Sequence, residues 1–114
     1  MIYISGKITN NSHYKEDFDN AEKWLKLCGK EVINPVKLEN IYPNKDYKFY
    51  MQVAIAWLEQ CDEIYILKNY KTSIGAKAEL ALAKALNMKI HFENKQWKLK
   101  KNLFLTESQK ENKQ

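Results

Sequence analysis

Apolar residues alternate between two spacings along the first 92 positions. Short runs of β-branched and aromatic residues predict strands, and apolar positions three and four residues apart predict amphipathic helices. The predicted strands cover residues 2–4, 31–33, 63–67 and 89–92, with a further short strand expected at 96–99. The predicted helices cover residues 13–28, 47–60 and 74–86.

Polar and small residues mark where these elements begin and end. Ser12 is expected to cap the first helix, and Gly29 is a natural stop for it. Asn34 and Pro35 close the second strand, and we expect a connecting loop from there to the helix that begins at Tyr47.

Strands that alternate with helices predict an α/β fold. Right-handed crossovers between parallel strands place helices on both faces of the sheet. We therefore expect a three-layer sandwich around a small, mainly parallel sheet of four or five strands. At this length the chain forms one folded domain, residues 1–94, followed by a tail at residues 95–114.

The net charge of +5 is concentrated in the tail. Residues 1–94 carry 13 lysines against 12 acidic residues, whereas residues 95–114 carry six lysines against two. All 19 basic residues are lysine, although base-edge readout and bidentate phosphate binding favour arginine. We expect no specific nucleic-acid binding, and we interpret the tail as a solvated basic segment.

Neither metal binding nor a membrane location is expected. Cys28 and Cys61 stand apart and are predicted to be reduced core residues, which favours the cytoplasm. His13 and His91 lack metal-ligand spacing, so we expect no metal and no other cofactor. The sequence has no 18-residue apolar run, and its first strand begins at Ile2, so neither a membrane span nor a signal peptide is expected.

Candidate binding residues follow three of the predicted strands. Ser5, Gly6 and Lys7 follow the first strand, Asn34 follows the second, and residues 69–79 follow the third. Parallel sheets bind ligands beyond the carboxyl ends of their strands. We therefore expect these residues to share one ligand site.

Residues 73–79, Ser-Ile-Gly-Ala-Lys-Ala-Glu, stand between the third strand and the helix that follows it. A serine hydroxyl and unobstructed N–H groups at a helix start can bind an anion, aided by the helix dipole. Glu79 would lie about one turn into that helix. This pattern suits a phosphorylated ligand beside a carboxylate. The structural alternative makes Ser73 a cap, Gly75 a turn residue and Glu79 an exposed dipole partner.

Five segments, at residues 2–9, 32–35, 50–51, 61–65 and 73–79, occur in a characteristic order. Together they resemble the nucleoside 2-deoxyribosyltransferase-like superfamily, over residues 1–93. Within it, the chain is similar to a small uncharacterised branch common in phages and prophages.

The resemblance implies a flavodoxin-like fold and chemistry at an N-glycosidic bond. Relatives exchange bases between deoxynucleosides or release the base from a deoxynucleoside monophosphate. The resemblance implies that Glu79 is the nucleophile and that Ser5, Gly6, Ser73 and Gly75 hold the sugar 5′ end or its phosphate. A carboxylate near C1′ can trap the oxocarbenium-like centre covalently, as in retaining glycosidases. The resemblance also implies a homo-oligomer, a dimer or larger.

The sequence departs from the superfamily pattern at one position. Many relatives carry an aspartate that assists the departing base, and Ala54 stands at the matching position. Asp62 precedes its strand and is expected at the far end of the sheet. Asp46, Tyr47 and Tyr50 are nearer candidates, although Tyr50 is equally compatible with packing.

Three further candidates each have a structural alternative. Lys7 is either a phosphate contact or a solvated lysine. Tyr3 either stacks on a base or packs in the core. Asn34 either binds a sugar hydroxyl or serves the turn.

The leading expectation is an enzyme that cleaves or exchanges the N-glycosidic bond of a nucleoside or its 5′-monophosphate through Glu79. The alternative, motivated by Ala54, is a protein that binds a nucleotide, or sequesters a nucleotide-derived signal, without turnover. A third class, a nucleic-acid accessory protein acting through the lysine-rich tail, is the least favoured. The base, the sugar and the need for a 5′-phosphate stay open.

Overall fold

A computed structural model describes residues 1–93 of the chain and contains one sheet of four parallel strands. The strands lie in the order β2-β1-β3-β4, so the chain moves outward from β1 to one edge and then crosses back to the other side. Their bounds are β1 (Ile2–Ser5), β2 (Val32–Ile33), β3 (Glu63–Ile66) and β4 (Lys89–Phe92).

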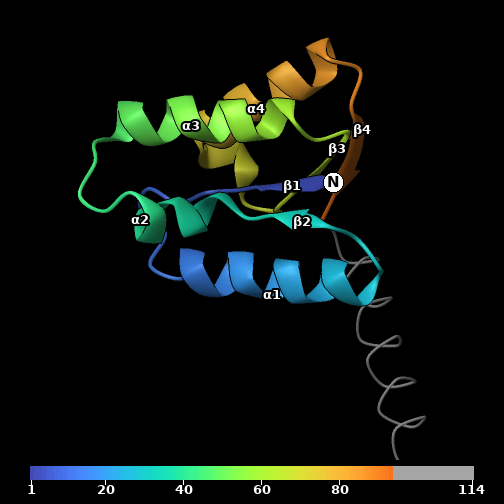
Figure 1. The fold of residues 1–114 in the computed structure, drawn as a ribbon, viewed down its shortest axis with the longest axis horizontal. Coiled ribbons are helices and arrows are strands. Elements are labelled where there is room, and N and C mark those ends of the chain that lie inside the picture. The colour runs from blue at the N-terminus through green and yellow to red at the C-terminus, as the bar shows by residue number, and fades with distance from the viewer. Residues whose placement is uncertain (94–114) are drawn as a thin grey trace, which may run out of the picture.

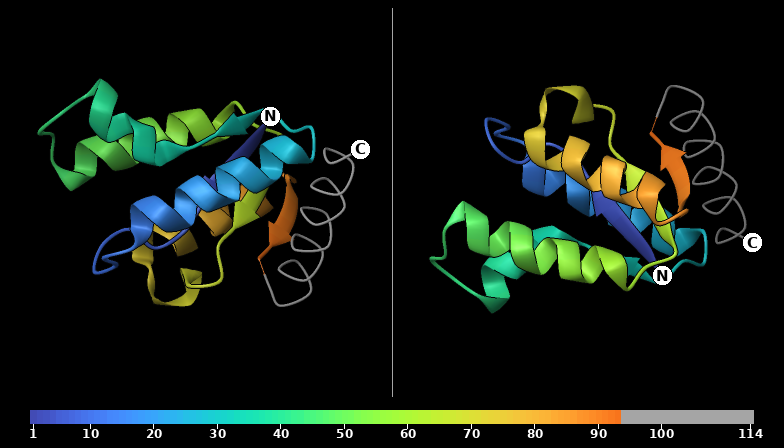
Figure 2. Two further views of the ribbon diagram at one scale, coloured as in Figure 1. Left: turned by 90° about the horizontal axis from the view of Figure 1, so that it is seen from below. Right: turned by 90° about the horizontal axis from the view of Figure 1, so that it is seen from above.

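Helices cover both faces of this sheet. Helix α1 (Tyr14–Leu27) lies on one face, and α3 (Tyr47–Glu59) and α4 (Ile74–Ala85) lie on the other (Figures 1 and 2). The predicted three-layer α/β sandwich is therefore confirmed, and its strand order is consistent with a flavodoxin-like fold.

Alternation along the strands separates two cores. Ile2 and Ile4 of β1 face α1, whereas Tyr3 faces α3 and α4. Strand β3 repeats the pattern, because Ile64 pairs in register with Tyr3, and Tyr65 with Ile4. Tyr3 of β1 therefore lies on the same side of the sheet as α4, where it forms part of the candidate site.

The connection between β2 and α3 differs from the expected loop. It contains a 3₁₀ turn, η1 (Pro35–Lys37), and a short helix, α2 (Leu38–Ile41). Asn34 begins this segment by accepting a hydrogen bond from the Val36 N–H at 3.0 Å, and Pro35 suits the first helical position. Leu38 anchors the segment in the core with 2% of its surface exposed. A second 3₁₀ turn, η2 (Tyr70–Thr72), precedes α4.

Two local predictions are wrong. Helix α1 has His13 at its N-cap position without a side-chain cap, because Ser12 lies one residue too early. Cys28 is exposed at the end of α1, whereas Cys61 is buried as expected, and both are free thiols. Gly29 does stop α1, with a φ of 80° that suits glycine.

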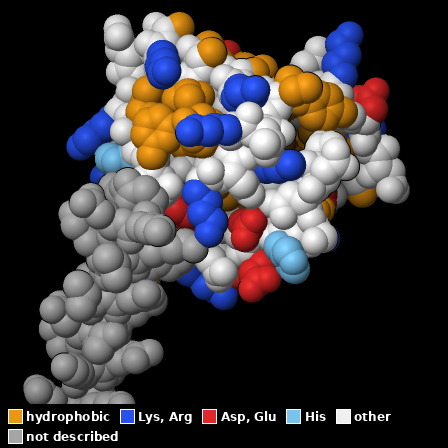
Figure 3. Space-filling view, turned by 180° about the vertical axis from the view of Figure 1, so that it is seen from behind, with side chains coloured by type: hydrophobic (Ala, Val, Ile, Leu, Met, Phe, Trp, Pro, Cys, Tyr) orange, Lys and Arg blue, Asp and Glu red, His pale blue; other side chains and the backbone are white. Residues whose placement is uncertain are grey.

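The predicted strand at 96–99 and the basic tail at 95–114 lie outside the described residues. None of the helices within residues 1–93 is long and apolar enough to cross a membrane. Figure 3 shows lysine side chains on the face viewed from behind, separated by hydrophobic and acidic groups rather than joined into a continuous basic patch.

Candidate functional site

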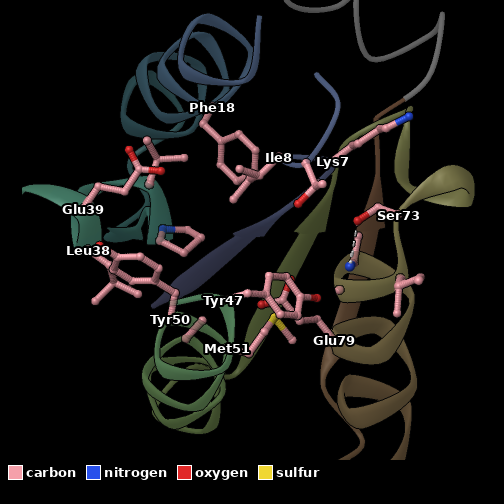
Figure 4. Close-up of a pocket in the computed structure, with 18 of the residues that line it drawn as sticks. Lys7, Ile8, Phe18, Leu38, Glu39, Tyr47, Tyr50, Met51, Ser73 and Glu79 are labelled. Atoms are coloured by element: carbon pink, nitrogen blue, oxygen red, sulfur yellow. Dashed lines mark hydrogen bonds between the residues drawn. The ribbon is translucent and has the colours of Figure 1, made fainter. Parts of the chain in front are cut away.

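A cavity of about 550 Å³ lies at the carboxyl end of the sheet (Figure 4). Its size suits a small organic ligand. It is lined from the loop after β1, from η1 and α2, from the start of α3, and from η2 and the start of α4. Its apolar wall includes Ile8, Phe18, Val36, Leu38, Met51 and Ala54.

Glu79 lines this cavity from α4 and is 7% exposed. Two hydroxyl groups of β1 donate hydrogen bonds to its carboxylate. Tyr3 donates to Oε2, and Ser5 donates to Oε1 at 2.7 Å. Because Tyr3 and Ser5 are two positions apart on one strand, both side chains point to the same face and fix the carboxylate from below. The alternative of an exposed dipole partner is therefore wrong for Glu79.

Burial raises the pKa of Glu79 to about 7, although the hydrogen bonds from Tyr3 and Ser5 act in the opposite direction. Burial and the neighbouring carboxylate also raise the pKa of Tyr3, so its phenol stays protonated as a donor. A buried carboxylate that titrates near neutrality in a cavity is typical of functional sites.

Ser73 caps α4, accepting a hydrogen bond from the Ala76 N–H at 3.1 Å. Both Ser73 and Gly75 line the cavity, so the start of this helix faces the same space as Glu79. Gly75 leaves little room for a side chain, because an added Cβ would lie 3.1 Å from the Tyr47 hydroxyl. The structure thus brings together the helix start and the carboxylate that the sequence singled out.

The loop after β1 forms another part of the cavity wall. Gly6 and Lys7 both line it, and the Lys7 ammonium donates to the Thr72 hydroxyl at 3.1 Å. Asn69 accepts a hydrogen bond from the Lys7 N–H at 3.2 Å, which ties this loop to the turn before α4. A Cβ on Gly6 would lie 2.6 Å from Leu67, so the close approach of these segments depends on glycine.

Of the remaining predicted residues, Tyr3 lines the cavity, whereas Ser5 and Asn34 do not. Ser5 is fully buried and reaches the site only through Glu79. Tyr3 is packed in the core with no exposed surface and its hydroxyl is held by Glu79, which favours the packing alternative over base stacking. Asn34 uses its side chain to start η1 and does not line this cavity, which favours its turn alternative.

Four residues considered for assisting the base have different environments. Asp62 binds the N-terminal ammonium at 3.0 Å, at the opposite end of the sheet, as expected. Asp46 caps α3 through the Phe49 N–H, and Tyr50 donates to the Tyr42 carbonyl oxygen at 2.6 Å. Tyr47 lines the cavity with 58% of its surface exposed.

Ala54 also lines the cavity, where an aspartate would face the same space.

Sequence reasoning missed the wall formed by η1 and α2. Glu39 and Leu38 of this wall line the cavity, and Phe18 contributes from α1. The Asn34-Pro35 pair carried a signal for the turn, because both residues favour a helix start. Nothing local indicated that α2 would face Glu79 across a cavity.

Within residues 1–93, no group of three or more histidine, cysteine or acidic side chains is arranged to hold a metal ion. The Ser73 hydroxyl, the Lys7 ammonium and the Gly75 N–H are groups at the cavity that can bind an anion.

The fold and the site define an α/β domain with a ligand cavity and a buried carboxylate at the carboxyl end of a parallel sheet. Residues 1–92 match the family model described as "Domain of unknown function (DUF4406)", and the chain belongs to this family. The searches of curated proteins and of solved structures gave no match. The family description states no activity, so the resemblance to the nucleoside 2-deoxyribosyltransferase-like superfamily stays a prediction.

Proposed function

We propose that this protein cleaves or exchanges the N-glycosidic bond of a nucleoside or nucleoside 5′-monophosphate, with Glu79 as the nucleophile. The observation that carries the proposal is the Glu79 carboxylate, buried in the cavity and held by the Tyr3 and Ser5 hydroxyls. A ligand that fills the cavity would lie against this group with water excluded.

The two hydroxyls leave carboxylate lone pairs for attack, since each oxygen accepts only one of these hydrogen bonds. As the C1′–N bond breaks, its electron pair leaves with the base, and a Glu79 oxygen bonds to C1′. Water or a second base then attacks C1′ and releases Glu79. The departing base must take a proton, which the hydroxyl of Tyr47 at the cavity wall or solvent would supply.

The start of α4 and the apolar wall would fix the orientation of a bound nucleotide in the cavity. The Ser73 hydroxyl and the Gly75 N–H, together with the Lys7 ammonium, would hold a 5′-phosphate on one side of the cavity. The apolar wall of η1, α2 and α3 would hold the base. This arrangement supports a nucleotide over a nucleoside as the ligand.

Attack requires an ionised Glu79, and its pKa is about 7. We expect base release to rise as the pH rises through about 7 and to level off above it. Glu79→Gln would remove both the activity and this dependence.

The test is chromatographic detection of free base after incubation of the protein with a panel of nucleosides and 5′-monophosphates. Base release should be lost in Glu79→Ala and retained in Glu59→Ala, which removes an exposed carboxylate at the end of α3. Thermal unfolding would show that both variants fold. Equal base release by the wild type and a folded Glu79→Ala variant would exclude the nucleophile role.

A second candidate function is the binding of a nucleotide, or the sequestering of a nucleotide-derived signal, without turnover, and Ala54 favours it. Saturable binding with no product after long incubation would support this function. Ala54→Asp then gives a decisive comparison, because it places a carboxyl group in the cavity wall. Base release that appears only in Ala54→Asp would mean that the native chain binds its ligand without cleaving it.

We also retain the proposal of a cytoplasmic homo-oligomer. Large apolar side chains beside the cavity support self-association, because Ile74 is 83% exposed and Tyr47 is 58% exposed.

A further inference from the structure

Glu39 brings a second carboxylate to the cavity. It lies on α2, half-buried, on the side opposite Ser73 and Lys7 (Figure 4). Its position across from the start of α4 separates it from the groups suited to a phosphate. A ligand that spans the cavity would meet Glu39 with its other end.

Tyr14 holds this carboxylate in place. Its hydroxyl lies 3.2 Å from Oε1 and 3.0 Å from Oε2 of Glu39. Burial raises the pKa of Tyr14, and so does the hydrogen bond to Glu39, which keeps the phenol protonated as a donor. Within residues 1–93, no lysine lies within ion-pair distance of Glu39, so its carboxylate oxygens stay available to accept hydrogen bonds from a ligand.

Apolar groups surround this carboxylate on the cavity side. Figure 4 shows Phe18, Ile8 and Leu38 around the space that Glu39 faces. A flat heterocycle fits between such side chains, and by displacing water from the cavity side of Glu39 it would strengthen its own hydrogen bonds to the carboxylate.

We propose that Glu39 is a specificity-determining residue that accepts two N–H groups from the base of a bound nucleotide and thereby favours guanine. The inference rests on the proposed function only in taking a nucleotide as the ligand. Guanine presents a ring N–H and an amino group side by side, which match the two oxygens of a carboxylate. Adenine and cytosine present an acceptor nitrogen beside the amino group, and thymine and uracil present one N–H between two carbonyls.

The test measures binding of guanosine, inosine and adenosine 5′-monophosphates by calorimetry, independently of turnover. Inosine keeps the ring N–H of guanine and lacks the amino group. We expect guanosine monophosphate to bind about tenfold more tightly than either of the others, as one additional charge-assisted hydrogen bond gives.

Glu39→Gln replaces one acceptor oxygen with a donor, and an amide matches adenine. This variant should lose the preference for guanosine monophosphate and bind adenosine monophosphate best. Tyr14→Phe should reduce the preference for guanosine monophosphate over the other two nucleotides. It should not abolish nucleotide binding, because the Glu39 carboxylate remains. Glu16→Gln, which neutralises an exposed carboxylate nearby on α1, is the matched control and should keep the wild-type order.

The outcomes separate this inference from the proposed activity. Tight binding of guanosine monophosphate that depends on Glu39, without base release from it, would support the inference and count against catalysis. Base release that depends on Glu79, with equal binding of the three nucleotides, would overturn the inference alone. No binding of any of the three would overturn the inference, and activity on unphosphorylated nucleosides would then still support the catalytic role.

Discussion

Replacing Glu79 by glutamine should stabilise the folded protein at alkaline pH. The amide keeps the shape of the carboxylate and can still hydrogen-bond both the Tyr3 and Ser5 hydroxyls, since a hydroxyl either donates or accepts. It removes the cost of burying a negative charge. The magnitude follows from the rise of the Glu79 pKa from its ordinary value of 4.5 to about 7.

Below pH 4.5, Glu79 is protonated in both the folded and the unfolded chain, so no penalty arises. Between 4.5 and about 7 the unfolded chain loses this proton while the folded chain keeps it, so the free energy of unfolding falls as the pH rises. Above about 7 the penalty is complete, at about 3 kcal/mol. The gain from Glu79→Gln should therefore be near zero at about pH 4.5 and approach this value at about pH 8.5.

Urea unfolding of both proteins across this pH range measures the gain. Glu22→Gln is the matched control, because Glu22 is also 7% exposed but lies 2.9 Å from the Lys37 ammonium. Burial acts to raise the pKa of Glu22, and Lys37 and Lys26 outweigh it, so the net pKa is lowered. Its contribution to stability is lost as the pH falls, so Glu22→Gln should destabilise most at neutral pH. A gain for Glu79→Gln that does not change with pH would refute the reasoning.

Three further predictions test how the site is built. Gly6→Ala should destabilise the fold by about 1–3 kcal/mol, measured by urea unfolding, because its Cβ would lie 2.6–2.9 Å from buried Leu67. Gly75→Ala should leave stability nearly unchanged, because its Cβ meets the Tyr47 hydroxyl, the end of an exposed side chain, at 3.1 Å. Gly75→Ala should weaken nucleotide binding in calorimetry, because the new methyl group displaces that hydroxyl and crowds the start of α4. An unchanged affinity would show that Gly75 does not contribute to ligand binding. Ile74→Lys should convert an oligomer into monomers in light scattering; a wild-type monomer, or an oligomer that survives the substitution, would exclude Ile74 from an interface.

The order of elements was predictable because each strand and helix carries its own periodicity. The same order placed Gly6, Lys7, Ser73 and Glu79 at one end of the sheet, since parallel strands end together. These four residues do line one cavity. Their grouping required no knowledge of side-chain packing.

The environment of Glu79 was not predictable in the same way. Its pKa depends on burial and on Tyr3, which lies 76 positions away in the sequence. From the sequence, Tyr3 is predicted either to pack in the core, as aromatic residues in strands usually do, or to stack on a base. Its hydroxyl reaches Glu79 only because β1 lies inside the sheet, next to α4, rather than at an edge. The cavity wall that carries Glu39 was not predictable from the sequence either, because α2 is only four residues long and shows no periodicity.

The contrast between Glu79 and Glu22 bears on what Glu79 does. Glu22 is buried with two lysines, so its charge contributes to stability. Glu79 is buried with two neutral hydroxyls, which orient the carboxylate without neutralising it. Glutamine would meet the same hydroxyls at lower free energy, so packing and hydrogen bonding do not account for a carboxylate at this position. The proposed reaction does account for a carboxylate here, because the penalty of burial would raise the energy of the ionised Glu79 that the proposal has attack C1′.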